Sequence, residues 1–373
     1  MHFKHLILIS LCFLLVACSG RQGKMQTVPE GNKYATGFKI EHQDSVTLIE
    51  VYSPWDKGAV MATYTITEPI HRIATASCTH IGFIDALGQL GSVVTVCNKS
   101  LVYTRLADSV LDAGDSMSPN IETIVMANVD GVMVSTYAQG DGSSEQMKKL
   151  GLNVIYNNEW METNPLARAE WIRFVGAFYG CEDQADSIFN EVETKYISDK
   201  ETKYEVQSTN HQSTKIMTGN NFRGTWYVPS GNTYMGNLFK DAGADYPYYD
   251  DMRSGSIPLT LESVLSEFGD ADVWVGSNGR TLEELARLDE KHTWFKAYKE
   301  GRVYNWYRQT TETGGNNFWE RGVVHPEEIL QDLVSILHNG DSLHYAERLK
   351  YIFGRFFLYI PFICCTFAVP YGK

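Results

Sequence analysis

Two parts of this sequence alternate short apolar strands with helices, and a long uninterrupted helical pattern lies between them. The helical pattern covers residues 182 to about 205, with apolar residues at helical spacing. A helix of that length spans roughly 36 Å, which is long for a connection within one domain and suits a rod that joins two. Strand–helix alternation is typical of mainly parallel sheets with helices on both faces. We therefore expect an α/β fold of two lobes joined by one long helix.

Changes in pattern divide the chain further. Residues 37–67 alternate apolar and polar positions, which predicts short strands with a hairpin ahead of the first lobe. Two Rossmann-like lobes follow at 69–181 and 207–349, with the linker helix at 182–206 between them. The other parts are a leader at 1–18, a flexible tether at 19–36, the N-terminal β extension at 37–68 and a hydrophobic tail at 350–373.

The first eighteen residues have the form of an export signal. A short, mostly basic start precedes an apolar run at 6–17, which is broken only by Ser10 and is short for a membrane span. Small residues lead into Cys18, so we expect Cys18 to be acylated and to anchor an exported protein to a membrane facing the periplasm or the cell exterior. The alternative is a leader with an incidental cysteine. No acidic run follows Cys18, so the sequence leaves open which membrane receives the lipid.

The hydrophobic tail has two interpretations. Residues 351–369 are long enough for a membrane helix, which would make the lipid one of two anchors. Arg355 near one end and Pro361 in the middle weaken that interpretation. The alternative is an altered reading frame or a truncated fusion.

Charge and cysteine content exclude several classes of function. A formal net charge of −13 argues against nucleic acid and anionic membrane surfaces as partners, although local arginines can still bind an anionic ligand. The cysteines form no CxxC pair and no zinc-like spacing with histidines. We expect Cys78 and Cys97 to be buried free thiols, and a disulfide between them is the alternative.

One short unit occurs in both lobes. Residues 120–125 (NIETIV) precede the strand at 132–135, and residues 260–265 (TLESVL) precede the strand at 273–276. Each unit has a capping residue, an apolar residue, a glutamate, a small polar residue and two apolar residues. Two such units, one on either side of a long helix, indicate two similar lobes. Ligands of open α/β sheets bind outside the carboxyl ends of the strands, so we expect a cleft between loops of both lobes.

The order of these features resembles that of a solute-binding lipoprotein of an ABC importer, of the type that serves iron–siderophore, haem and cobalamin uptake. This type is the class III periplasmic binding protein with a single linker helix. The resemblance runs from about Gly37 to Leu349 and rests on the order and spacing of several short segments. They are HRI at 71–73, SCTHI at 77–81, DAG at 112–114, NIE at 120–122, PLARAEW at 165–171, DAGA at 241–244 and EEILQDL at 327–333. In that family the two lobes move little when ligand binds.

The resemblance gives the repeated glutamates a role. In the family, one glutamate near the start of this helix in each lobe docks onto arginines of the permease dimer, which implies docking through Glu122 and Glu262. Exposed carboxylates at two fixed points would set orientation against a basic partner. The alternative is that each glutamate only complements the positive end of its helix, worth about 0.3–1 kcal/mol.

The resemblance also places the ligand among the loops around the cleft. The candidate ligand-binding residues are Thr79, His80, Tyr103, Met117 and Tyr137 in the first lobe and Arg223, Trp226, Arg253, Trp306 and Arg308 in the second. Aromatic side chains with arginines suit a flat or conjugated ligand that carries negative charge. We expect a ferric siderophore or related metal chelate, with haem or cobalamin as the alternative, and no resident cofactor.

Several of these residues have a structural alternative. Any one aromatic side chain could pack in the core or anchor a loop. His80 is expected to cap or pack at a helix start rather than to ligate a metal. The stretch 314–321, rich in glycine and asparagine, is expected to form a mobile loop near the cleft.

The sequence carries no local catalytic signature. It contains no GxSxG, no HExxH, no Walker A loop and no GxGxxG after a strand. We therefore expect no enzyme and no catalytic residue. A lipid-anchored surface enzyme without a local motif is one alternative. A binder of free metal ions is the other, and the histidines show no telling spacing for it.

Overall fold

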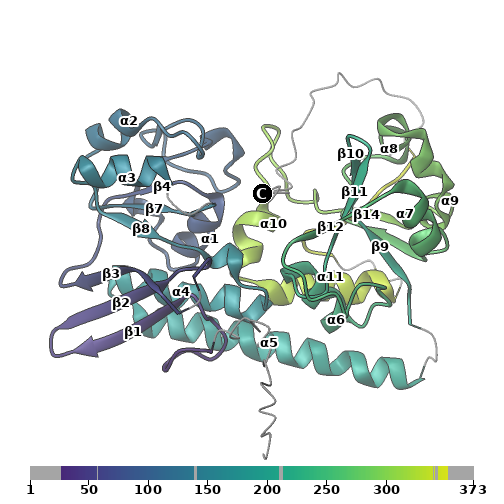
Figure 1. The fold of residues 1–373 in the computed structure, drawn as a ribbon, viewed down its shortest axis with the longest axis horizontal. Helices are drawn as coiled ribbons and strands as arrows, with labels where there is room; N and C mark the ends of the chain where they lie inside the picture. The colour runs from purple at the N-terminus through teal and green to yellow at the C-terminus, as the bar shows by residue number, and fades with distance from the viewer. Residues whose placement is uncertain are drawn as a thin grey trace, which may run out of the picture.

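The computed structural model describes residues 27–56, 58–137, 141–209, 213–338, 340 and 343–351. Two α/β lobes stand side by side above helix α5 (Glu182–Thr209), which runs beneath both (Figure 1). The predicted α/β class, the two lobes and the long helix are therefore confirmed.

The export signal with Cys18 and the hydrophobic tail from 352 onward lie outside the described residues. Within the described ranges, no helix combines the length and the apolar character needed to cross a membrane.

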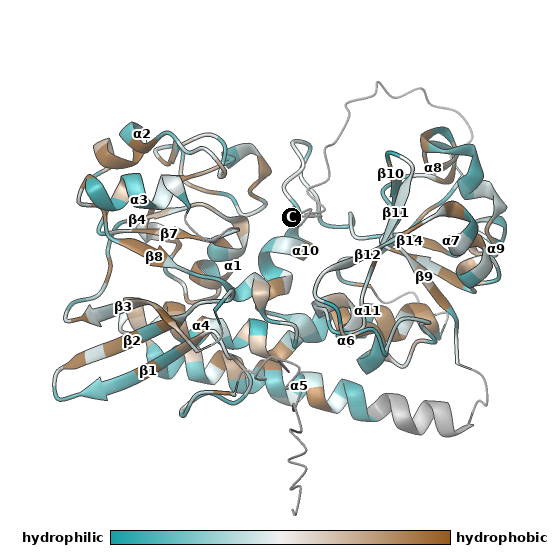
Figure 2. Cartoon of the chain, in the orientation of Figure 1, coloured by the Kyte–Doolittle hydropathy of each residue, from teal (hydrophilic) through white to brown (hydrophobic). Residues whose placement is uncertain are grey.

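The first lobe is built on a parallel sheet of five strands in the order β6-β5-β4-β7-β8. The strands are β4 (Ile73–Thr75), β5 (Val93–Val96), β6 (Leu111–Asp112), β7 (Gly131–Val134) and β8 (Val154–Tyr156). The helices are α1 (Cys78–Ala86), α2 (Ile121–Met126) and α3 (Gly142–Lys149), with short 3-10 turns η1 (Leu90–Ser92), η2 (Lys99–Leu101) and η3 (Glu159–Met161). The central strands are apolar along their length because both faces of a parallel sheet are covered (Figure 2).

The second lobe repeats this plan with a smaller sheet in the order β15-β14-β13-β9. β9 (Ile216–Thr218), β13 (Val273–Val275) and β14 (Val303–Asn305) are parallel, and β15 (Glu347–Arg348) is antiparallel to β14. The helices are α6 (Tyr234–Ala242), α7 (Leu261–Phe268), α8 (Leu282–Leu288), α9 (Lys296–Lys299) and α11 (Pro326–Leu337), with the turn η4 (Glu290–Trp294). The sheet is therefore mainly parallel, as predicted.

The second lobe also contains an antiparallel sheet that the sequence did not indicate. Its strands are β10 (Asn220–Phe222), β11 (Thr225–Pro229) and β12 (Ser256–Leu259). Arg223 and Gly224 form the turn between β10 and β11, with φ values of 53° and 91°. Two residues at positive φ give a tight turn whose twist matches antiparallel strands, but arginine is unusual there, so the sequence carries no strong hairpin signal.

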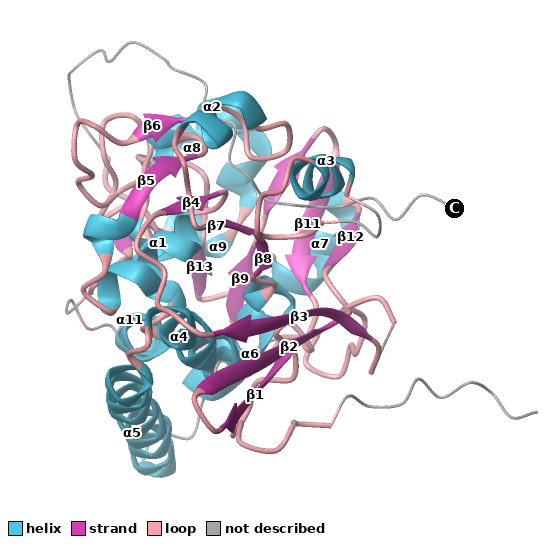
Figure 3. Ribbon diagram, turned by 90° about the vertical axis from the view of Figure 1, so that its left-hand side faces the viewer, coloured by secondary structure: helices cyan, strands magenta, loops and turns pink. Residues whose placement is uncertain are grey.

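The N-terminal extension is an antiparallel sheet that packs on helix α4 (Pro165–Tyr179). Its strands are β1 (Phe38–Gln43), β2 (Val46–Tyr52) and β3 (Val60–Ile66), in that order (Figure 3). Phe38 packs edge-on against Trp171 of α4, with 4.9 Å between ring centroids. Asn164 caps α4, and Gly180 ends it at a φ of 61°.

Two buried carboxylates attach the chain ahead of β1 to α4. Glu170 accepts the backbone N–H groups of Lys33, Tyr34 and Ala35 at 2.7–2.8 Å. Glu162, just before α4, accepts the N–H groups of residues 36 and 37 at 2.8 and 2.9 Å. A buried carboxylate is costly unless it is hydrogen-bonded, and backbone N–H groups that leave water need an acceptor. Each of these hydrogen bonds therefore satisfies both the buried carboxylate and the backbone N–H group.

The C-terminal end of the second lobe is held in the same way. Asp332 of α11 is fully buried and accepts the backbone N–H groups of Tyr345 and Ala346 at 2.7 Å. Those residues lead directly into β15, the edge strand that follows. The carboxylate thus fixes the segment that closes the edge of the second sheet.

The cysteines of the described residues carry free thiols. Cys97 is buried, and Cys78 and Cys181 are half-buried. Burial raises the pKa of the Cys78 thiol to about 12, so it stays protonated at neutral pH. The expectation of a buried free thiol is therefore confirmed for Cys97, whereas Cys78 is a free thiol that is only half-buried.

We expect Glu170→Gln to lower the free energy of unfolding by about 2–3 kcal/mol, because a neutral amide replaces a charged acceptor of three backbone N–H groups. Urea unfolding followed by circular dichroism measures the change. Glu145→Gln on the exposed face of α3 is the matched control and should change stability by less than about 0.5 kcal/mol. Equal effects of the two substitutions would contradict a special role for Glu170.

Candidate functional site

The repeated unit of the sequence forms the same structure in both lobes. Asn120 caps α2 by accepting the N–H of Thr123 at 3.1 Å, and Thr260 caps α7 by accepting the N–H of Ser263 at 3.3 Å. α2 leads into β7 and α7 leads into β13, which are inner strands of their sheets. The unit therefore begins a helix in each lobe and delivers the chain to an equivalent strand.

Each of these helices carries an exposed glutamate in its first turn. Glu122 of α2 and Glu262 of α7 both face solvent. A hydrogen bond from its own backbone N–H, with a second from the Thr260 side chain, lowers the pKa of Glu262, so its carboxylate is charged at neutral pH. The two glutamates are thus available to a partner while each also complements its helix N-terminus.

A small, mostly apolar pocket lies at the carboxyl ends of β4, β5 and β7. Its polar walls come from Thr75, Thr95, Cys97, Ser116, Ser135, Tyr137, Asp141 and Ser143. The rest of its lining is apolar and includes Met147 and Ile124. This is where parallel α/β sheets bind ligands, because loops diverge there and leave room. Of the candidates named from the sequence, only Tyr137 lines this pocket.

The other first-lobe candidates lie at different depths. Thr79 and His80 are buried on α1. The His80 Nε2 lies 3.1 Å from the Ser135 hydroxyl, and burial lowers the pKa of His80 to about 4. The ring is therefore neutral and packed, in line with the structural alternative for this residue. Met117 is exposed in a loop, and Tyr103 is half-buried in another.

The aromatic candidates of the second lobe are mostly enclosed. Trp226 is 2% exposed, and its indole N–H donates to the Thr218 carbonyl at 2.9 Å. Its ring packs against Trp274 and Phe295, which makes it a core residue of this lobe. Trp306 directly follows β14 and is nearly enclosed as well. A ligand has little access to either ring in this structure.

The arginine candidates all lie on the surface but differ in their partners. Arg253 is held by Asp251, whose two carboxylate oxygens each lie 3.0 Å from its Nε. Arg223 lies over the ring of Phe222 at 5.1 Å. Arg308, just after β14, forms no side-chain hydrogen bond or ion pair with any residue in the described ranges. Among the candidate arginines, Arg308 would therefore lose the fewest existing interactions on binding an anion.

A short helical strut connects the two lobes. It consists of α10 (Asn317–Glu320) and the turn η5 (Arg321–Val323), and it packs against α1 of the first lobe (Figure 1). A Cβ on Gly82 of α1 would meet the Glu320 carbonyl oxygen at 1.9 Å, so only glycine permits this approach. The expectation of a mobile loop over 314–321 is therefore wrong, because this stretch is packed between lobes.

Glu320 fixes the strut to the first lobe. Its carboxylate accepts the backbone N–H groups of Tyr103 and Thr104, both at 2.8 Å. Burial raises the pKa of Glu320, although these hydrogen bonds oppose the shift. On the other side of the strut, Phe318 stacks on Trp306 at 4.7 Å between centroids. The Tyr103 loop of the first lobe and Trp306 of the second lobe thus both contact the strut.

A second connection lies beneath the strut. Arg168 of α4 pairs with Glu159 of η3, and both are buried. The same guanidinium lies 4.9 Å from the ring of Tyr234 on α6, in the second lobe. Sequence patterns gave no sign of this pair, because its members come from separate elements and meet only in the fold.

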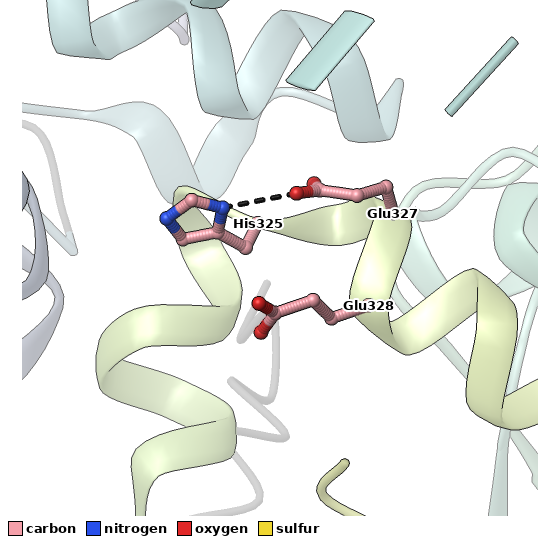
Figure 4. Close-up of side chains that lie close together, drawn as sticks. All are labelled: His325, Glu327 and Glu328. Carbon is pink, nitrogen blue, oxygen red and sulfur yellow. Dashed lines mark hydrogen bonds and ion pairs between the residues drawn. The ribbon is translucent and has the colours of Figure 1, made fainter. Parts of the chain in front are cut away.

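His325, Glu327 and Glu328 gather at the start of α11, with ligand-type atoms within 4.8 Å of one another (Figure 4). His325 Nδ1 lies 3.0 Å from Glu327. Glu328 is already engaged, since it accepts from Tyr345 and from Arg321 at 2.9 Å. Burial raises the pKa of Glu328, but these two hydrogen bonds outweigh it and lower the pKa overall. The group therefore has the character of an ion-pair network that ties η5 to α11.

The family sequence model described as "Periplasmic binding protein" matches residues 73–310. The uncharacterized lipoprotein MJ0878 of Methanocaldococcus jannaschii is 28% identical over 308 residues, which cover 77% of this chain and 70% of the relative.

Two solved structures illustrate the likeness in fold. A periplasmic heme-binding protein from Pseudomonas aeruginosa matches with a TM-score of 0.60 and 15% identity, over 76% of this chain and all of that one. A protein of an ABC-type Fe3+-hydroxamate transport system from Saccharomonospora viridis matches with a TM-score of 0.54 and 16% identity, over 74% of this chain and 96% of that one. At these identities the matches show a shared fold.

We expect Glu320→Gln to loosen the contact between the strut and the Tyr103 loop, because the amide replaces a charged acceptor of two backbone N–H groups. Hydrogen–deuterium exchange at the amides of residues 103 and 104 should become about tenfold faster or more, which corresponds to about 1.4 kcal/mol of lost local stability. Glu347→Gln on exposed β15 is the control. Unchanged exchange in the Glu320 variant would show that the carboxylate does not hold the loop.

Proposed function

The chain belongs to the periplasmic binding protein family, and from that premise we propose that it is the substrate-binding component of an ABC importer for a ferric siderophore or a related metal chelate. Haem or cobalamin is the alternative ligand of the same type. The observation that carries the proposal is the matched pair of capped helices, α2 and α7, each with an exposed glutamate ahead of an inner strand. Two such points on two lobes suit a partner with two equivalent subunits.

The distribution of charge supports an anionic ligand. Arg308 and Arg223 lie on the second lobe and keep their guanidinium groups at the surface. Guanidinium groups pair with carboxylates, catecholates or hydroxamate oxygens, and arginine does so with a planar, two-pronged geometry. Exposed arginines on one lobe and the half-buried Tyr103 and Tyr137 on the other would hold a charged, partly flat chelate between them.

A lipid on Cys18 would anchor the protein at the membrane that contains the permease. An anchored binding protein searches only the volume near the membrane, so its effective concentration at the permease is high. The relative MJ0878 is itself named a lipoprotein, which supports an exported, anchored protein. The docking partner would be a permease dimer, met through Glu122 and Glu262.

Catalysis has little support by comparison. The sequence lacks the common catalytic signatures, and the family consists of binding proteins. The acidic cluster at His325 is engaged internally, which disfavours a free metal ion as the ligand. We therefore propose capture and delivery without chemical change of the ligand.

We expect at least one of four probes to bind in the micromolar range or tighter: a ferric trihydroxamate, a ferric catecholate, haemin or cobalamin. Tryptophan quenching and thermal shift both report binding. Arg308→Ala should weaken an anionic chelate by about tenfold, or about 1.4 kcal/mol, whereas Arg287→Ala on the exposed face of α8 should not. Failure of all four probes below millimolar concentration would defeat the transport proposal.

Charge reversal separates docking from ligand binding. Glu122→Arg combined with Glu262→Arg should leave ligand affinity unchanged, because both side chains are exposed and neither lines the pocket. Uptake, or ligand-stimulated ATPase activity with the reconstituted permease, should be abolished by repulsion from basic partner residues. The control pair is Glu145→Arg with Glu267→Arg, exposed on the same two lobes. Normal uptake by the first pair, with lost ligand binding, would overturn the docking assignment.

A further inference from the structure

The β10–β11 hairpin of the second lobe carries an exposed aromatic side chain next to a residue in a strained conformation. Phe222 ends β10 and is 58% exposed. Arg223, at the tip, has a φ of 53°, a region that arginine rarely adopts. Backbone strain of this kind persists only where the surrounding structure enforces it, and it clusters at ligand-binding positions. The strained tip and the exposed ring together point to a binding role for the hairpin.

Close packing and hydrogen bonds fix the base of this hairpin to the sheet of the second lobe. β10 follows β9 after Gly219 alone, and a Cβ on Gly219 would meet the Tyr227 carbonyl oxygen at 2.0 Å. The Asn220 side chain donates to the Gly276 carbonyl and accepts from the Asn278 N–H, both at 3.0 Å. Because Gly276 directly follows β13, the hairpin is held at the carboxyl edge of the sheet, where open α/β sheets bind their ligands.

Strand alternation puts Phe222 on the outward face of the hairpin. Trp226 and Val228 of β11 point into the core, with 2% and 0% of their surface exposed. Phe222 pairs with Thr225 across the ladder, one position away from Trp226, so its ring lies on the opposite face. Asn220, two residues before Phe222, shares that outward face and contacts the loop after β13. The hairpin lies on the side of the second lobe that faces the first lobe (Figure 1). Phe222 is therefore placed to meet a ligand between the lobes.

Arg223 adds a positive charge beside this ring. Its guanidinium lies 5.1 Å from the centroid of the Phe222 ring and has no hydrogen bond or ion pair with residues in the described ranges. Contact with the ring orients the guanidinium and leaves its N–H groups free to pair with an anionic oxygen. The carboxylate of Asp289 accepts from Asn221 at 2.8 Å, and Asn221 lies on the inward face, opposite Trp226. The charge of Arg223 is therefore available on the outward side.

We propose that Phe222 and Arg223 form a recognition site for a negatively charged aromatic ring on the outer surface of the ligand, such as a catecholate or an aromatic carboxylate. The ring packs against Phe222, and its anionic oxygen pairs with the guanidinium of Arg223. This inference rests on the proposed function, since it names the feature by which the importer selects its ligand. A permease surface basic enough to meet Glu122 and Glu262 would repel Arg223, which favours the ligand over the permease as the occupant.

The test compares two small carboxylates of equal charge, benzoate with an aromatic ring and cyclohexanecarboxylate with a saturated one. Ligand-observed saturation-transfer NMR on the full-length protein measures the binding of both. Benzoate should bind with a dissociation constant on the order of 10 mM, about threefold more tightly than cyclohexanecarboxylate. Benzyl alcohol, which has the ring without the charge, should bind about threefold more weakly than benzoate. Equal binding of the two carboxylates, or no saturable binding of benzoate, would overturn the inference.

Two substitutions assign the binding to the hairpin. Phe222→Ala should abolish the preference for benzoate over cyclohexanecarboxylate, whereas Arg223→Asn should weaken both carboxylates by about threefold or more. Asparagine tolerates positive φ and so preserves the turn, and both variants should melt within about 2 °C of wild type because the side chains are exposed. The control Trp294→Ala removes another exposed aromatic side chain of the same lobe and should keep the preference. Retention of the benzoate preference in Phe222→Ala would contradict the proposed site.

A pair of chelates then links the hairpin to transport. Wild type should bind a ferric tricatecholate, whose charged aromatic rings face outward, about tenfold more tightly than an aliphatic ferric trihydroxamate, and Phe222→Ala should reduce this preference by about threefold. Equal binding of the two chelates by wild type would overturn the inference while the transport proposal stands. If Phe222→Ala keeps the preference but abolishes uptake, the hairpin contacts the permease and the inference fails. If benzoate binds the hairpin but no chelate, haemin or cobalamin binds, the recognition site is supported and the transport proposal fails.

Discussion

Buried carboxylates that accept backbone N–H groups are the interaction on which the rest of this structure depends. Glu170 and Glu162 hold the chain ahead of β1, Glu320 holds the Tyr103 loop, and Asp332 holds the segment before β15. Each carboxylate is buried at a point where two parts of the chain meet. Such a group is stable only while its donors stay in place, because an unpaired buried charge is costly. The donors are therefore held as firmly as the carboxylate.

This constraint explains why the two lobes have a defined relation to each other. Helix α5 alone would leave them free to move about a hinge. The strut of α10 and η5 adds a second connection through Glu320 and Gly82, and Arg168 with Tyr234 adds a third. A binding protein held in this way presents its ligand surfaces and its two exposed glutamates in a fixed geometry. A preformed geometry reduces the ordering cost when a binding protein takes up its ligand.

The sequence predicted the periodic elements well, because local signals determine them. Asn164 caps α4, Pro165 begins it and a glycine ends it, and apolar runs form the inner strands of the sheets. The β10–β11 hairpin was missed because its turn places Arg223 at positive φ. The strut was mistaken for a mobile loop because its main anchor joins Tyr103 and Glu320, which are 217 residues apart. No local pattern encodes such a contact.

The candidate ligand residues could also be predicted only in part. The exposure of the arginines follows from their chemistry, whereas the burial of Trp226 and His80 depends on distant packing partners.

The most direct test of this account is the distance between the lobes with and without ligand. Met126 on α2 and Ser266 on α7 are both exposed. A spin label can therefore be attached at each position through non-cysteine chemistry. Pulsed electron–electron double resonance would report their separation in free protein and in protein saturated with whichever of the proposed ligands binds. The account predicts one narrow distance distribution that ligand leaves almost unchanged, because the carboxylate contacts hold the lobes in both states. A broad distribution in the free protein, or a shift of several ångströms on binding, would contradict it.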